Sequence, residues 1–439
     1  MADILTSIIG VVIGLGLMIL VHELGHFFVA KAFGVRVDVF SIGFGPRLWG
    51  WRRGVTDYRI SALPVGGYVK MAGDNPMEQR AGAPDEFLSK TRWQRTLIAL
   101  AGPATNILIA VIMIAGLLVV GKAQPVYVDR PVDVAWVLKD SPAEKAGIRA
   151  GDRIVQFRGK ANPTWEGVLF ELLFASLNSS VPITIERDGQ MISTAVQPSA
   201  AEFAVVGYPE EPALVGSVTR NKPAERSGVQ PGDRVISLEQ QPVVSPFQVG
   251  SLIQQRNGQP TNLEIQRGDR TLHVTLRPTW DDPGDGGGAR WQIGVSWHFA
   301  TEKHSYSLGG AVERSVWLNA RITEQILHVV SQLFQGRMSL KQVQGPLGIV
   351  RESGRAARRG PADLISVMAL ISLNLGILNL LPIPILDGGH ILLMAIEGTL
   401  RRDLSVRVKE RFVQAGLVFL LVIFAIVMYN DVLRMLPSH

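Results

Sequence analysis

The sequence contains no cysteine among its 439 residues. This absence excludes disulfide bonds, thiolate zinc fingers, thiol proteases and iron–sulfur clusters, because each of them needs a cysteine sulfur. Charged residues are also scarce, at 19%, and the mean hydropathy of +0.20 is high for a water-soluble enzyme. The composition therefore predicts a chain of several domains, one of which lies in lipid.

Four long apolar runs indicate where the chain crosses a membrane. They cover residues 1–34, 97–120, 364–396 and 412–430. The first run has no basic start and is too long for the core of a cleaved signal peptide, so we expect it to be retained. The sequence therefore predicts a polytopic α-helical membrane protein with about four transmembrane helices.

Basic residues are concentrated in the two loops at residues 35–96 and 397–411. By the positive-inside rule both loops are cytoplasmic, which places both termini and the long middle segment on the outer face. The net charge of +6 is then mostly a consequence of topology. Nucleic-acid binding is the alternative, but these cations flank spans and do not alternate with stacking aromatics.

The middle segment contains a repeat. Residues 141–155 (SPAEKAGIRAGDRIV) match residues 222–236 (KPAERSGVQPGDRVI), and a shift of 81 residues aligns Pro142 with Pro223. The match predicts two tandem α+β domains, at 122–205 and 206–280, that resemble PDZ domains. PDZ domains bind peptides by adding a strand to a sheet edge. A rigid cap with no peptide in either groove is an equally good interpretation at this point.

Residues 281–363 are expected to form a linker followed by amphipathic surface helices. The first part of this segment is rich in glycine, which indicates a flexible linker. Residues 309–335 place apolar side chains at near-helical spacing, interrupted by ionisable groups. This pattern favours a helix on the membrane surface, or against the outer domains, over a further span.

The first apolar run contains the pattern His22-Glu23-Leu24-Gly25-His26. On a helix the two histidines face the same side, where neutral imidazoles can bind zinc, and Glu23 stands beside the metal as a base for its water. Ionisable groups inside a span cost about 2.5 to 3.5 kcal/mol each, so this cluster needs a function. A polar cluster between neighbouring helices, or a surface helix with solvated histidines, is the alternative.

Zinc requires a third protein ligand. Asp387 is the expected ligand, because helix lengths place it near the cytoplasmic side of the membrane, at the depth of His22. His390 is the weaker alternative. The surrounding residues 379–389 (NLLPIPILDGG) break a helix at two prolines and two glycines, which would open backbone around a wetted cavity. An ordinary proline kink is the simpler interpretation of that break.

The HExxH pattern in one span and the pattern N-x-x-P-x-P-x-L-D-G in a later span together resemble the site-2 protease family of intramembrane zinc metalloproteases. Two PDZ-like copies between the second and third spans make the chain similar to the bacterial branch of regulator-of-sigma-E proteases. The resemblance implies a zinc metalloendopeptidase with one Zn²⁺ per chain. It implies His22, His26 and Asp387 as ligands, Glu23 as catalytic base and Asn379 as a polar contact to substrate.

The resemblance also implies a location and a substrate class. The location is the bacterial inner membrane, with the PDZ-like pair in the periplasm and the active site toward the cytoplasm. The substrates are single-span membrane proteins, such as an anti-sigma factor already trimmed on its outer side; remnant signal peptides are a further candidate. The PDZ-like pair would admit only trimmed substrates.

A protease that cleaves inside a membrane must bind unwound substrate. Residues 55–72 have hairpin character around turn glycines, and the resemblance implies a re-entrant β element on the cytoplasmic side whose edge pairs with substrate. The residues expected to bind there are Gly66, Gly67, Tyr68 and Val69. A cytoplasmic hairpin without such a role is the alternative.

Amide side chains offer both a donor and an acceptor to unwound peptide. On that ground Asn374 and Asn379 are expected to contact substrate. Interhelical hydrogen bonding is the alternative for both, and it is the preferred interpretation for Asn106.

Two other functions compete with the protease. One is a membrane scaffold or metal carrier, in which the PDZ-like copies do the work and the zinc is structural or transported. The other is a protease whose first helix lies in the membrane interface instead of crossing it.

Overall fold

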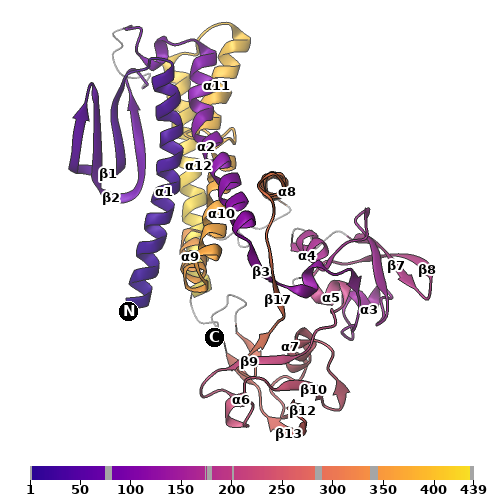
Figure 1. The fold of residues 1–439 in the computed structure, drawn as a ribbon. Coiled ribbons are helices and arrows are strands. Elements are labelled where there is room, and N and C mark those ends of the chain that lie inside the picture. Colours follow the sequence, from indigo (N-terminus) through magenta and orange to yellow (C-terminus); the bar gives the residue numbers. More distant parts are fainter. Residues whose placement is uncertain are drawn as a thin grey trace. The chain divides into compact units, whose positions relative to one another are not determined.

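The computed structural model (Figure 1) describes residues 2–74, 82–173, 175, 180–199, 202–281, 289–336 and 345–435. The chain divides into two compact units, which we call the helical unit (Met1–Lys122 and Ser305–His439) and the β-rich unit (Ala123–His304). Both the HELGH motif and the 379–389 segment belong to the helical unit. A site built from these two motifs therefore lies inside one unit.

The helical unit is built mainly from long helices. They are α1 (Ala2–Ala32), α2 (Arg92–Val120), α8 (Leu308–Phe334), α9 (Pro346–Arg359), α10 (Pro361–Asn379), α11 (Asp387–Leu400) and α12 (Val406–Met435), with a short helix η1 (Phe87–Ser89). Among the described residues, α2, α10 and α12 are long and apolar enough to cross a membrane. This finding supports a membrane protein; the role of α1 as a further span stays a prediction.

Helix α2 is the centre of the unit and contacts α1, α8, α10 and α11. Small residues allow the helices to approach closely. A Cβ on Gly25 of α1 would lie 2.4 Å from the carbonyl oxygen of Ala101, and one on Gly376 of α10 would lie 2.9 Å from that of Pro103. The helices that carry the sequence motifs are therefore held directly against α2.

The expected break in the third span is present. Helix α10 ends at Asn379 and α11 begins at Asp387, and Figure 1 shows the two helices following one another along α2. A Cβ on Gly388 would lie 2.3 Å from the carbonyl oxygens of Leu380 and Leu381, so only glycine lets the connecting loop fold against the first turn of α11. The break therefore sets Asp387 at the start of a helix.

Helix α8 matches the helix expected at 309–335. Its position on the membrane surface or against the outer domains stays a prediction. The helix packs against α2, and the Ser315 hydroxyl donates a hydrogen bond to the Val111 carbonyl oxygen at 2.7 Å. Ser315 and Asn319 are buried. The small polar side chains of α8 therefore face a neighbouring helix.

Helix α12 is longer at both ends than the expected span at 412–430. Near its start, Lys409 pairs with the buried carboxylate of Glu397 at 2.7 Å. Near its end, the buried Asp431 carboxylate accepts hydrogen bonds from N–H groups at the start of α9, among them that of Gly345 at 3.0 Å. Polar contacts thus tie both ends of α12 to neighbouring segments of the unit, and the Asp431 carboxylate satisfies N–H groups at the start of α9.

Strands β1 (Val37–Arg53) and β2 (Thr56–Met71) form an antiparallel sheet beside α1. Phe40 is registered with both Tyr58 and Val69, so residues 37–42 lie between two arms of β2. We expected the two arms, before and after the glycines at 66 and 67, to pair with each other. That expectation was wrong, because residues 37–42 are themselves extended and supply the strand between the arms.

The β-rich unit contains the repeat as two sheets of similar order. The first copy has strands β4 (Val132–Asp133), β5 (Arg153–Phe157), β6 (Lys160–Ala161), β7 (Val181–Arg187) and β8 (Gln190–Val196), with helices α3 (Pro142–Lys145), α4 (Trp165–Leu173) and α5 (Glu202–Val206). The second copy has β9 (Leu214–Val218), β10 (Arg234–Leu238), β11 (Gln241–Pro242), β12 (Thr261–Arg267) and β13 (Arg270–Leu276), with α6 (Pro223–Arg226) and α7 (Pro246–Gln255). Each sheet has its own apolar core.

Each copy of the repeat contains a Gly-Asp pair, at residues 151–152 and 232–233. The aspartate of this pair has the same structural role in both copies. Arg187 Nε donates a hydrogen bond to Asp152 Oδ1 at 2.6 Å, and Arg267 Nε donates one to Asp233 Oδ1 at 2.7 Å. Burial raises the pKa of Asp233, but hydrogen bonds from Arg267 and from the Gln230 N–H outweigh burial and hold the pKa below its usual value. The aspartates therefore tie the start of one strand to its neighbour.

The second copy extends beyond residue 280, where we expected the linker to begin. Strands β14 (Thr279–Asp281), β15 (Arg290–Gln292) and β16 (Val295–His298) follow, and β16 joins the second sheet beside β9. Strand β17 (Thr301–His304) pairs with β3 (Lys122–Pro125), and η2 (Val126–Asp129) follows β3. The glycine-rich residues 282–288 lie outside the described residues. The predicted end of the second copy at residue 280 was wrong, because the strand that completes the second sheet comes after the glycines.

Candidate active site

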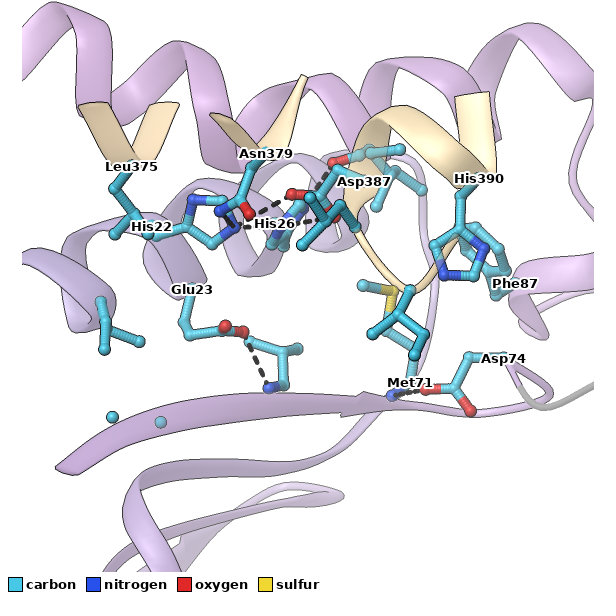
Figure 2. Close-up of a pocket in the computed structure, with 18 of the residues that line it drawn as sticks. His22, Glu23, His26, Met71, Asp74, Phe87, Leu375, Asn379, Asp387 and His390 are labelled. Carbon is cyan, nitrogen blue, oxygen red and sulfur yellow. Dashed lines mark hydrogen bonds and ion pairs between the residues drawn. The ribbon is translucent and has the colours of Figure 1, made fainter. Parts of the chain in front are cut away.

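Three potential metal ligands meet where α1, α2 and the start of α11 come together. His22 Nε2 lies 3.1 Å from Asp387 Oδ2, His26 Nε2 lies 3.5 Å from Asp387 Oδ1, and the two Nε2 atoms are 3.2 Å apart. Figure 2 shows the two imidazoles directed toward the Asp387 carboxylate. Ligand atoms about 2.0 to 2.1 Å from a tetrahedral zinc are about 3.3 Å from one another. The three side chains therefore fit one zinc ion.

Backbone and amide groups orient the two imidazoles. His26 Nδ1 lies 2.7 Å from the Ile98 carbonyl oxygen, so Nδ1 carries the proton and Nε2 keeps its lone pair for a metal. Asn106 Nδ2 lies 3.3 Å from His22 Nδ1, while Asn106 Oδ1 is buried without a hydrogen-bond partner. If the amide oxygen and nitrogen of Asn106 are exchanged, the oxygen accepts a hydrogen bond from His22 Nδ1. The lone pair of His22 Nε2 is then free for a metal. Asn106 thus makes an interhelical hydrogen bond, as expected, and its partner is a candidate ligand.

Gly102 of α2 makes room for both imidazoles. A Cβ at this position would lie 2.3 Å from His26 Nε2 and 2.8 Å from His22 Cε1. Real Cβ atoms do not approach other atoms so closely. Sequence reasoning missed Gly102, because nothing in the sequence pairs a glycine of the second span with histidines of the first.

Glu23 follows His22 on α1, and its carboxylate is directed to the sheet. Its Oε2 accepts a hydrogen bond from the Val69 backbone N–H at 3.1 Å (Figure 2). Gly67 lies directly beside Glu23, since a Cβ on this glycine would be 3.7 Å from Glu23 Cγ, an ordinary van der Waals distance. The sheet therefore contacts the candidate catalytic base directly.

A cavity of about 670 Å³ joins these groups. Glu23, Gly66, Gly67, Val69 and Asn379 all line it, together with the three candidate ligands. The structure thus brings together most of the residues that the sequence suggested. Asn379 is close to the metal-ligand group, with Nδ2 3.5 Å from His22 Nε2.

Two of the suggested substrate contacts do not line the cavity. Tyr68 stacks on Phe44 with ring centroids 5.9 Å apart, because successive side chains of a strand point to opposite faces. Asn374 is five residues before Asn379, which turns it about 140° away on a helix. Leu375, four residues before, lines the cavity in its place.

His390 also lines the cavity but does not belong to the group of three ligand atoms. It lies one turn after Asp387 on α11, beside Asp74 and Met71 (Figure 2). The geometry therefore favours Asp387 over His390 as the third ligand. Asp74, whose Oδ2 accepts from the Met71 N–H at 2.9 Å, is a further acid of the cavity that the sequence did not single out.

Residues 10–423 of the chain match the model of peptidase family M50. A regulator of sigma-E protease, RseP, from Escherichia coli K12 is 30% identical over 99% of this chain and 100% of its own length. A regulator of sigma E protease from Salmonella typhi shows the same identity and coverage. A candidate zinc metalloprotease from Vibrio cholerae serotype O1 is 31% identical over 99% of this chain and 100% of its own.

Proposed function

The chain belongs to peptidase family M50 and is a metalloprotease, and we propose that it hydrolyses peptide bonds within transmembrane segments of single-span membrane proteins. The observation that carries the proposal is the group of His22, His26 and Asp387 at tetrahedral ligand distances, with Glu23 in the same cavity. The ligands come from α1 and from the break after an apolar helix. We infer that the site holds one zinc ion.

Each polar group of the cavity then has a chemical role. Bound zinc would lower the pKa of a water and polarise the peptide carbonyl. Glu23 takes a proton from the attacking water and returns it to the leaving amine. Asn379, beside His22, can donate from its amide to the carbonyl of the bond that is cut.

The substrate must be bound in extended form, because the peptide groups of a helix are already hydrogen-bonded. Residues 67–71 of β2 pair with β1 on one side and face the cavity on the other. This edge can take a substrate segment as an added strand. Gly66, Gly67 and Val69 are the contacts that the cavity supports, and Asn374 and Tyr68 have no such support.

We propose four spans, with α1 as the first, both termini and the β-rich unit on the outer face and the active site toward the cytoplasm. The basic loops at 35–96 and 397–411 support this orientation. In a bacterium the membrane would be the inner membrane. Because the chain has no cysteine, single cysteines at Arg53 and Asp269 can be labelled selectively. Labelling of both from the same side would refute the topology and favour an interfacial first helix.

The β-rich unit is proposed as a PDZ-like filter for substrates whose outer part has been removed. Its second copy has a groove of about 480 Å³ between α7 and β16, lined by Val249, Ile253 and residues 290–297. Two relatives are named for regulation of sigma-E, which suggests an anti-sigma factor as one substrate. Binding of peptide in the groove and purely steric exclusion are both compatible with this role.

The test uses purified protein in liposomes with a single-span substrate. Glu23→Gln should keep one zinc per chain and abolish cleavage, because the amide cannot accept the proton. Glu313→Gln, an exposed site on α8, is the matched control and should cleave normally. If Glu23→Gln cleaves normally, the protease proposal fails, and a scaffold or metal carrier that depends on the PDZ-like copies becomes the better explanation.

A further inference from the structure

Two outward N–H groups on the edge of β2 that faces the cavity already donate hydrogen bonds. Val69 and Met71 are two residues apart, so their N–H groups point to the same edge. The first donates to Glu23 Oε2 at 3.1 Å and the second to Asp74 Oδ2 at 2.9 Å. Both acceptors are carboxylates of the chain itself.

A substrate strand added to this edge needs the same donors. In an antiparallel or parallel ladder the outward N–H groups of alternate residues bind carbonyls of the incoming strand. One N–H hydrogen supports one strong hydrogen bond. Glu23 and a substrate carbonyl therefore compete for the Val69 N–H.

We propose that Val69 N–H is an exchangeable contact, which holds Glu23 against β2 at rest and is taken over by the substrate backbone on binding. This inference rests on the proposed function, because it assumes that Glu23 is the base and that substrate adds to β2. Docking of an extended segment then releases the Glu23 carboxylate toward the three ligands. The base becomes free only when an unwound segment lies in the cavity.

Two further observations fit this exchange. Glu23 lies against Gly67, so no side chain stands between the carboxylate and the strand. Figure 2 shows the carboxylate directed to the strand, on the side away from the imidazoles and Asp387. The carboxylate can thus leave the strand by rotation of its own side chain.

The experiment measures peptide binding to metal-free protein, so neither zinc nor turnover enters the result. The probe is a fluorescein-labelled leucine–alanine peptide of about 22 residues with a central Gly-Pro break, in detergent micelles. Glu23→Ala should bind it about five- to tenfold more tightly than the unchanged protein, because the substrate no longer displaces a charged acceptor. Val69→Pro removes the N–H on the edge that faces the cavity, and the double variant Glu23→Ala, Val69→Pro should lose the gain. Val69→Ala keeps the N–H and should preserve the gain.

Amide hydrogen exchange provides a second measurement, which does not depend on how well the proline variant folds. In Glu23→Ala without peptide, the Val69 amide should exchange at least about tenfold faster, and the peptide should protect it again. Equal peptide affinity of Glu23→Ala and the unchanged protein, or an equal gain in the Val69→Pro background, would overturn the proposal. Either result leaves the protease itself intact if Glu23→Gln still abolishes cleavage.

Discussion

Replacing Gly102 with alanine should destroy the metal site while leaving the helices in place. The added Cβ would lie 2.3 Å from His26 Nε2, whereas ordinary contacts begin at 3.4 Å, so the imidazole must move by about 1.1 Å. Zinc ligands tolerate displacements of only about 0.2 Å. A retreat of α2 from α1 would also break the close packing of Gly25 on the Ala101 carbonyl. We expect zinc affinity to fall at least about 100-fold.

The assay is zinc stoichiometry by mass spectrometry after dialysis against a graded series of chelator concentrations. Gly116→Ala is the matched control, because it makes the same change on the same helix and its Cβ would meet no atom within 4 Å. It should bind zinc normally and unfold at the same or a slightly higher temperature. If Gly102→Ala binds zinc as tightly as Gly116→Ala, the described position of the imidazoles against α2 is incorrect.

Three further predictions concern other parts of the molecule. Asp387→Asn should lower zinc affinity by at least about 100-fold and His390→Asn should not, which chelator titration can separate; equal losses would contradict the choice of third ligand. Gly67→Ala would bring a Cβ within 2.7 Å of a carbonyl of the facing strand, so cleavage should fall about tenfold or more with zinc retained; unchanged cleavage would count against the β2 edge as substrate clamp. The pKa of Asp233 is lowered by Arg267, so its contribution to stability is present above its ordinary pKa of 3.8 and is lost as the pH falls below it. Asp233→Asn should therefore flatten the fall in melting temperature below pH 4, and an unchanged slope would contradict the assigned ion pair.

The sequence predicted the metal ligands and the catalytic base of the site better than the residues that pack around them. His22 and His26 share a helix face by their spacing alone, and the depth argument reached Asp387 because the apolar runs measure distance along the membrane normal. Gly102 and Asp74 could not be found in this way. Their roles depend on which helix and strand pack beside α1, and no local pattern encodes that packing.

The errors in the fold have the same origin. The arms of β2 were expected to pair with each other because the pattern around 55–72 is locally that of a hairpin, while the partner strand at 37–42 precedes them in the chain. The second repeat was predicted to end at residue 280, because the glycine-rich stretch that follows resembles a linker. Strand β16 lies beyond that stretch and completes the sheet through pairing with β9, which is a non-local contact.

The most direct test of the central claim is to locate the bond that the enzyme cuts. Zinc-loaded protein and its Glu23→Gln variant are incubated in liposomes with the same single-span substrate, and the products are mapped by mass spectrometry. The account predicts a cut inside the apolar segment by the unchanged protein and no cut by the variant, although both bind zinc. Cleavage confined to the water-exposed flanks, or an equal cut by both proteins, would contradict it.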